Sequence, residues 1–62
     1  MNAVIIKYAG PNDDGWFTRA DSRAVIQIIG GEKWFSDVPA NSGEAETINQ
    51  DARRIVEKLN AK

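Results

Sequence analysis

The 62-residue sequence contains no cysteine and no histidine. Without cysteine the chain forms no disulfide, and without both residue types it lacks the usual zinc ligands. The missing histidine is also the side chain that most often transfers protons near neutral pH. Small domains commonly compensate for a limited core with disulfides or a metal ion. We therefore expect stability from packing or self-association, and we expect no cofactor and no metal site.

Long apolar runs and an excess of one charge are also missing. No apolar stretch approaches the roughly 20 residues of a membrane span, and the first residues lack the basic head and apolar stretch of a signal peptide. The net charge of −1 gives the whole molecule no attraction to nucleic acid or to a membrane surface. The composition, 42% hydrophobic and 27% charged, is typical of one globular domain over residues 1–62. A chain without cysteine is compatible with a reducing compartment, and we expect a cytoplasmic protein.

Short β-branched and aromatic stretches separated by turn residues predict a sheet in the first part of the chain. We expect strands at Ala3 to Tyr8, at Trp16 to Ala20 and at Ala24 to Ile29. Glu32 to Ser36 follows a Gly-Gly pair, which is a known two-residue hairpin turn. This segment is either a fourth strand, which we prefer, or a loop that tucks Trp34 under the helix. We expect Trp34 to close the end of the core rather than to be an exposed recognition point.

A helix is expected from Glu44 to Asn60. Its apolar residues form one stripe at helical spacing: Ile48, Ala52, Ile55, Val56 and Leu59. Asn41 or Ser42 can cap the start, and Asn41 with Glu44 resembles a capping box. Asn60 is a candidate left-handed terminator. The sequence thus predicts an α+β fold: a three- or four-stranded antiparallel meander with one C-terminal helix packed on one face (βββα or ββββα).

Two Trp-Phe doublets, Trp16-Phe17 and Trp34-Phe35, indicate that one sheet face stays open. Neighbouring strand residues point to opposite faces, and one helix covers only one face. We assign these residues to the helix side: Val4, Ile6, Tyr8, Trp16, Ala24, Ile26 and Ile28. The outer face then consists of Ile5, Lys7, Phe17, Arg19, Val25, Gln27 and Ile29.

This outer face is the candidate partner-binding site, because apolar residues with an aromatic and an arginine are typical of protein interfaces. The hypothesis is a non-enzymatic binding protein with a protein partner, with Phe17 and Arg19 as anchors. Two alternatives use the same face. One is binding of single-stranded nucleic acid, although the cations are few and acids stand in the adjoining loops. The other is a structural homodimer.

Sequence motifs for catalysis or ion binding are weak. Ser22 lies between Asp21 and Arg23 without a base to activate it. Asp13 and Asp14 precede a glycine, but their spacing does not match a calcium-binding loop. We therefore expect no enzymatic activity.

The first strand, Val4-Ile5-Ile6-Lys7-Tyr8-Ala9-Gly10-Pro11, and the closing Ala-Arg-Arg-Ile-Val-Glu-Lys-Leu helix resemble small proteins of bacteriophages and mobile elements. In those proteins a strand ending in Lys-Tyr-x-Gly-Pro precedes two more strands and a terminal helix. The Trp-Phe doublets and the Gly-Gly turn depart from that pattern. The resemblance implies a setting in which small folds bind and block a host protein, as anti-CRISPR proteins do.

Overall fold

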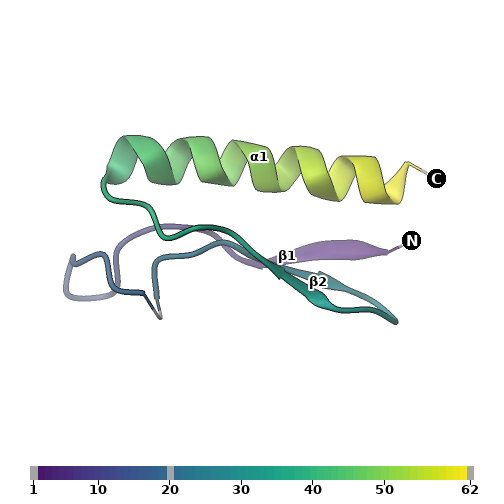
Figure 1. The fold of residues 1–62 in the computed structure, drawn as a ribbon, viewed down its shortest axis with the longest axis horizontal. Helices are drawn as coiled ribbons and strands as arrows, with labels where there is room; N and C mark the ends of the chain where they lie inside the picture. Colours follow the sequence, from purple (N-terminus) through teal and green to yellow (C-terminus); the bar gives the residue numbers. More distant parts are fainter. Residues whose placement is uncertain (1, 20, 62) are drawn as a thin grey trace.

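A computed structural model describes residues 2–19 and 21–61 of the chain. Three strands form one antiparallel sheet in the order β1-β2-β3. They are β1 (Ala3–Lys7), β2 (Val25–Ile28) and β3 (Lys33–Phe35), and α1 (Ser42–Asn60) follows them. The helix lies along one face of the sheet (Figure 1). The expected α+β meander with a C-terminal helix is therefore confirmed, and β3 is the strand that we preferred for the segment after the Gly-Gly pair.

The segment between β1 and β2 is a loop, and the strand expected at Trp16 to Ala20 is absent from residues 16–19, while Ala20 lies outside the described residues. Local hydrogen bonds hold this loop. The Asn12 Oδ1 accepts from the N–H groups of Asp14 and Trp16, both at 3.0 Å. The Thr18 hydroxyl donates to a carboxylate oxygen of Asp21 at 2.8 Å. Such side-chain bonds compete with strand pairing, which is why this segment turns rather than extends.

The register aligns the three strands in rows across the sheet. Val4 pairs with Gln27, which pairs with Lys33 on its other side. Val25 lies opposite Phe35, and the β1–β2 pairing is irregular between Ile5 and Lys7. The β2–β3 connection turns at Gly30, whose φ of +82° is a conformation that glycine adopts without strain.

The helix begins with the expected cap. Asn41 adopts an extended conformation, and its Oδ1 accepts from the Glu44 N–H at 3.0 Å. The Glu44 carboxylate in turn accepts from the Ala40 N–H at 2.6 Å, one residue before the position of a standard capping box. The apolar stripe packs on the core as expected, with Ala52 buried and the larger residues partly buried. Asn60 is not a left-handed terminator, since no described residue other than glycine has a positive φ.

Two asparagine side chains on α1 bind the backbone near the two ends of the first strand. Asn60 Oδ1 accepts from the Ala3 N–H at 2.7 Å, and its Nδ2 donates to the Ala3 carbonyl at 3.0 Å. Asn49 makes the same pair of bonds with Ala9, at 2.6 Å and 2.9 Å. Each amide thus supplies the donor and acceptor that a neighbouring strand would otherwise offer. We call these four bonds the asparagine clamps.

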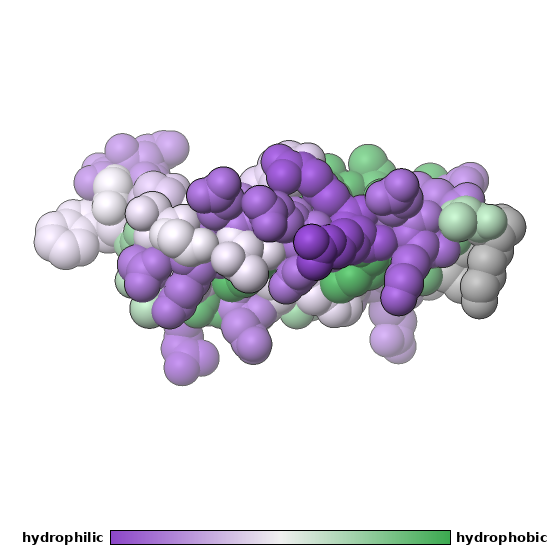
Figure 2. Space-filling view, turned by 90° about the horizontal axis from the view of Figure 1, so that it is seen from above, coloured by the Kyte–Doolittle hydropathy of each residue, from purple (hydrophilic) through white to green (hydrophobic). Residues whose placement is uncertain are grey.

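The core beneath the helix consists mainly of small side chains. Its buried apolar residues are Ala3, Ala9, Ala24, Ile26, Ala45 and Ala52. Close approach of α1 to the sheet requires such small residues, and it lets the short asparagine amides reach the backbone. Figure 2, seen from the helix side, shows a mostly hydrophilic outer surface with hydrophobic areas along the flanks. Much of the large apolar surface of the molecule is therefore not enclosed by the fold.

The face assignment from the sequence is correct for β2 and wrong for β1. Ala24 and Ile26 are buried, and Ile28 packs against the core, as expected. Val4, Ile6 and Tyr8, expected beneath the helix, are exposed instead. Expectation and structure differ because both alternating sets of β1 are apolar. The larger side-chain size of Val4, Ile6 and Tyr8 does not place them beneath the helix, because the close approach of α1 requires small residues such as Ala3 at that position.

Candidate functional site

Four large apolar side chains are exposed on the sheet side away from α1. They are 48%, 53%, 65% and 51% exposed and form what we call the open-face patch: Val4, Ile6, Ile29 and Phe35. Strand periodicity places these residues on one face, since Val4 and Ile6 alternate with Ile5, and Phe35 alternates with Trp34. Soluble monomers seldom expose contiguous apolar patches larger than a few hundred Å². This patch is the main candidate for an interaction surface.

Register joins the patch into a continuous surface. Val25 lies between β1 and Phe35 on this face, and it is only 8% exposed because its larger neighbours cover it. Gln27 lies between Val4 and Lys33 in the next row. Gln27 and Lys33 make this row polar at two of its three positions, and we call it the polar row. Polar groups beside exposed apolar side chains are typical of protein interfaces.

The charges on this side are basic. Both charged residues of the strands, Lys7 and Lys33, are lysines. The Arg23 guanidinium lies 5.8 Å from the centre of the Phe35 ring, within the range of a cation–π contact. On the flank by α1, the Arg53 guanidinium lies 5.2 Å from the centre of the Tyr8 ring. Aromatic rings with stacked arginines are well suited to recognise either a protein surface or nucleobases.

Only some of the predicted site residues lie together: Val25, Gln27 and Ile29 are on the open face. Ile5 and Phe17 pack against the core instead of facing outward. The expectation that Phe17 is an exposed anchor is therefore wrong. Arg19 is exposed in the loop between β1 and β2, and Ile29 is exposed as expected. Lys7, Gln27 and Val25 lie at partly or fully buried positions of the strands. Whether any of these residues binds a partner stays a prediction.

In each Trp-Phe doublet one ring is exposed and the other packs against the core, but the exposed ring is Trp in the first doublet and Phe in the second. Trp16 is 72% exposed at the tip of the loop, and Phe17 next to it packs on the core. Trp34 is partly buried against the core, as expected for a residue that closes its end, whereas Phe35 faces outward. Each doublet thus contributes one exposed ring, but in the first doublet it is the ring that we assigned to the interior.

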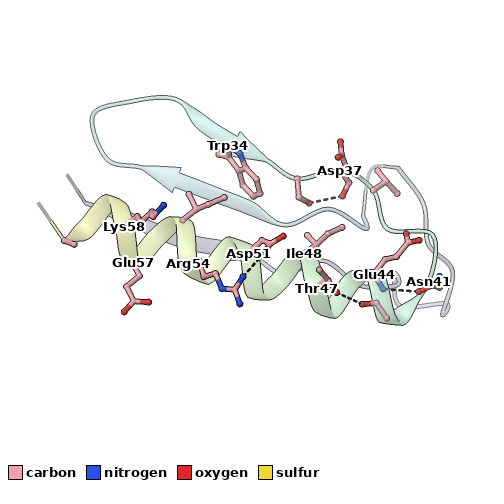
Figure 3. Close-up of a pocket in the computed structure, with 15 residues that line it drawn as sticks. Trp34, Asp37, Asn41, Glu44, Thr47, Ile48, Asp51, Arg54, Glu57 and Lys58 are labelled. Atoms are coloured by element: carbon pink, nitrogen blue, oxygen red, sulfur yellow. Dashed lines mark hydrogen bonds and ion pairs between the residues drawn. The ribbon is translucent and has the colours of Figure 1, made fainter.

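A groove runs between α1 and β3. It has a volume of about 1120 Å³ and is bordered by Trp34, by Ile48 and Ile55 of the helix, and by charged residues of both signs. The helix packs on β1 and β2 but not on β3, which leaves this space open. Figure 3 shows Trp34 directed from β3 toward the stretch of α1 that carries Asp51 and Arg54. These two residues form an exposed ion pair at 3.5 Å.

The described residues present little that points to chemistry. No group of three or more acidic, histidine or cysteine side chains within residues 2–19 and 21–61 is arranged to hold a metal ion. Ser22 is fully buried, so its hydroxyl does not face either the open face or the groove. In the same part of the chain, no helix is both long and apolar enough to cross a bilayer.

Comparisons with protein-family models, with curated proteins and with solved structures gave no match for this chain.

Proposed function

We propose that this chain is a small protein-binding domain that acts by covering a surface of another protein with the open face of its sheet. The observation that carries the proposal is the open-face patch, with four large apolar residues about half exposed or more on one side of a three-stranded sheet. In this proposal the domain blocks its partner rather than chemically altering it. The resemblance to small phage and mobile-element proteins supports that mode of action, and a host protein is the partner it implies.

The apolar side chains of the open-face patch supply the binding free energy. Burying Val4, Ile6 and Phe35 against a partner removes apolar surface from water, at roughly 25 cal/mol for each Å². Interface energy is usually concentrated in a few aromatic and arginine side chains. Phe35 with Arg23 above its ring has that composition and lies beside the buried Val25. Lys33 and Gln27 would orient the partner at the polar row.

A photo-crosslinking residue at position 29, at the edge of the patch, tests the proposal in a native lysate. The original sequence should capture a defined protein, and Ile6→Lys and Val4→Lys should each reduce that capture at least tenfold. Both replaced side chains are about half exposed, so thermal unfolding should change little. Each substitution places an ammonium group in the open-face patch, and a partner would have to desolvate that group on binding.

Gln50→Lys is the matched control. Gln50 is exposed on the helix, away from the open face, and the substitution adds the same side chain. It should capture the partner as the original sequence does. If Ile6→Lys and Val4→Lys also bind normally, the open face is not the docking surface and the proposal is wrong.

Binding of single-stranded nucleic acid is a second candidate, favoured by the cluster of Arg23, Phe35 and Lys33 on the open face. Its sign would be affinity for oligonucleotides that falls steeply as salt rises, because bound cations release counterions from the phosphates. Fluorescence anisotropy with a labelled oligonucleotide measures this directly. An absence of binding at low ionic strength would contradict this candidate.

A further inference from the structure

The outer edge of β3 carries unpaired backbone groups. The Ser36 N–H donates to the Ala24 carbonyl at 3.0 Å, so Ser36 directs its backbone toward β2. Backbone direction alternates along a strand, and Trp34 therefore also pairs inward with Ile26. Lys33 and Phe35 then direct their N–H and C=O groups away from the sheet. β3 is last in the sheet order, and no described element pairs with this edge.

The opposite edge of the sheet is partly occupied. On β1 the outward backbone groups of Ala3 are bonded to Asn60, and beyond the strand those of Ala9 are bonded to Asn49. Exposed strand edges are templates for pairing with another chain, and proteins usually cover them or blunt them. The asparagine clamps thus blunt the β1 edge near both of its ends, whereas no described side chain bonds to the outward groups of β3 in this way. Strand pairing with a second chain is therefore favoured at β3.

We infer that two copies of this chain pair through β3, antiparallel and edge to edge, about a two-fold axis at Trp34. In this register Lys33 of one copy lies opposite Phe35 of the other. Each such pair exchanges two backbone hydrogen bonds, which uses the outward groups of both residues. The three strands of each copy join into one six-stranded sheet, and both helices lie on the same side of it.

Charge at the two ends of β3 favours the second copy as the occupant. The strand begins with Lys33, and Asp37 follows its last residue by two positions. Antiparallel pairing makes Lys33 of one copy a diagonal neighbour of Asp37 of the other. Diagonal neighbours on one face lie about 7–8 Å apart, within reach of long side chains. Two such attractions form in the symmetric pair against one repulsion, between the two Lys33 residues, which are also diagonal neighbours, whereas parallel pairing in register would place only like charges together.

The groove provides the apolar part of the interface. Trp34 lies on the helix side of β3 and lines the groove. In the pair, the two Trp34 rings are directly opposite each other and occupy the space between the two helices. An interface of standard size buries about 800 Å² of each partner, which is roughly a fifth of the 4437 Å² surface of this chain. A three-residue edge is too small by itself, so the groove must close as well.

Sedimentation equilibrium tests the inference over a range from about 1 μM to about 1 mM. The weight-average mass should rise with concentration toward twice the 6.8 kDa of one chain. Lys33→Pro removes an outward N–H without removing a bond to β2, and proline is tolerated at such edge positions. This variant should remain at the mass of one chain. Ser42→Pro is the matched control at the first position of α1, where proline is also tolerated, and it should pair normally.

A charge exchange tests the register and decides the matter if circular dichroism shows that Lys33→Pro does not fold. Lys33→Glu and Asp37→Lys should each weaken pairing, because each places like charges side by side. The double variant Lys33→Glu/Asp37→Lys should restore it.

Three results would overturn the inference. The first is a mass that stays at one chain throughout the concentration range. The second is failure of the double variant to recover pairing. The third is loss of pairing in Ile6→Lys, which would place the contact on the open face instead of the edge.

Discussion

Replacing Asn49 with alanine should destabilise the fold more than its partial exposure indicates. The substitution removes the two bonds, of 2.6 Å and 2.9 Å, that the amide makes with the Ala9 backbone. Ala9 is only 7% exposed, so its N–H and C=O groups are left without a partner in a confined position. An orphaned buried polar group costs about 1–3 kcal/mol, which gives a loss of about 2–6 kcal/mol for the two.

That loss is large for a domain of this size. Typical stabilities of about 0.05–0.15 kcal/mol per residue correspond to roughly 3–9 kcal/mol for 62 residues. The Asn49→Ala variant should therefore unfold at a much lower urea concentration, or be largely unfolded in buffer. Urea titrations followed by far-UV circular dichroism measure the change in the free energy of unfolding. Gln50→Ala is the control, because Gln50 is exposed on the same helix, and it should change stability by no more than about 0.5 kcal/mol.

The variant Asn49→Asp tests the two hydrogen bonds individually, because it keeps the acceptor of the amide and removes the donor. The carboxylate still accepts from the Ala9 N–H, but it repels the Ala9 carbonyl to which the amide donated. That repulsion raises the pKa of the introduced carboxyl in the folded state above its unfolded value of about 3.9. Stability relative to the original sequence should therefore be greatest below the unfolded pKa and be lost as pH rises through the folded pKa. A loss of stability no greater than in Gln50→Ala, at any pH, would refute the clamp argument.

Three further predictions concern neighbouring features. Asn60→Ala should cost about 1–3 kcal/mol in urea titrations, less than Asn49→Ala, because the last turn of a helix frays more readily; an equal or larger loss would contradict this. Asn41→Ala should lower the free energy of unfolding by about 1 kcal/mol through loss of the helix cap, seen as a lower midpoint in thermal unfolding. Trp16→Ala should change stability by no more than about 0.5 kcal/mol, whereas Phe17→Ala should cost about 2 kcal/mol or more, since only Phe17 packs on the core. The reverse order in urea titrations would show that the loop is packed differently.

Sequence reasoning succeeded where one physical signal dominated. The helical stripe from Ile48 to Leu59 has a single apolar face, and the helix formed with that face inward. Asn41 has the residue type and spacing of a cap, and the cap is present. The Gly-Gly pair preceded β3, because glycine readily adopts the turn that joins two strands.

Reasoning failed where two signals of equal strength competed. In β1 both Ile5 and Ile6 are strong strand formers, so alternation alone cannot say which faces the helix. The deciding residues are the small Ala3 and Ala9, whose backbones lie against asparagine amides. The small size of these two alanines identifies the helix side only if it is known how closely α1 approaches the sheet. Asn49 and Asn60 lie 11 residues apart, about three helical turns, and this spacing on one border of the stripe was the signal that sequence reasoning missed.

The candidate site was only partly predictable for the same reason. An open apolar face follows from having one helix and three strands, and an exposed apolar face is present. Which residues belong to that face depends on which side of β1 is turned toward the helix. It also depends on the loop that is present in place of the expected second strand. Ile29 was placed correctly because β2 carries its buried residues on one clear side. Phe17 was not, because the strand that would have turned it outward does not form.

The asparagine clamps also bear on the order in which the chain becomes structured during synthesis. Ala3 and Asn60 are 57 positions apart, so Ala3 is synthesised well before its partner. Closing contacts of such sequence separation is slow, because the entropy of the intervening chain must be lost first. The nascent sheet therefore exposes the Ala3 border until Asn60 has been synthesised. During that interval the uncovered backbone groups are available for pairing with neighbouring nascent chains.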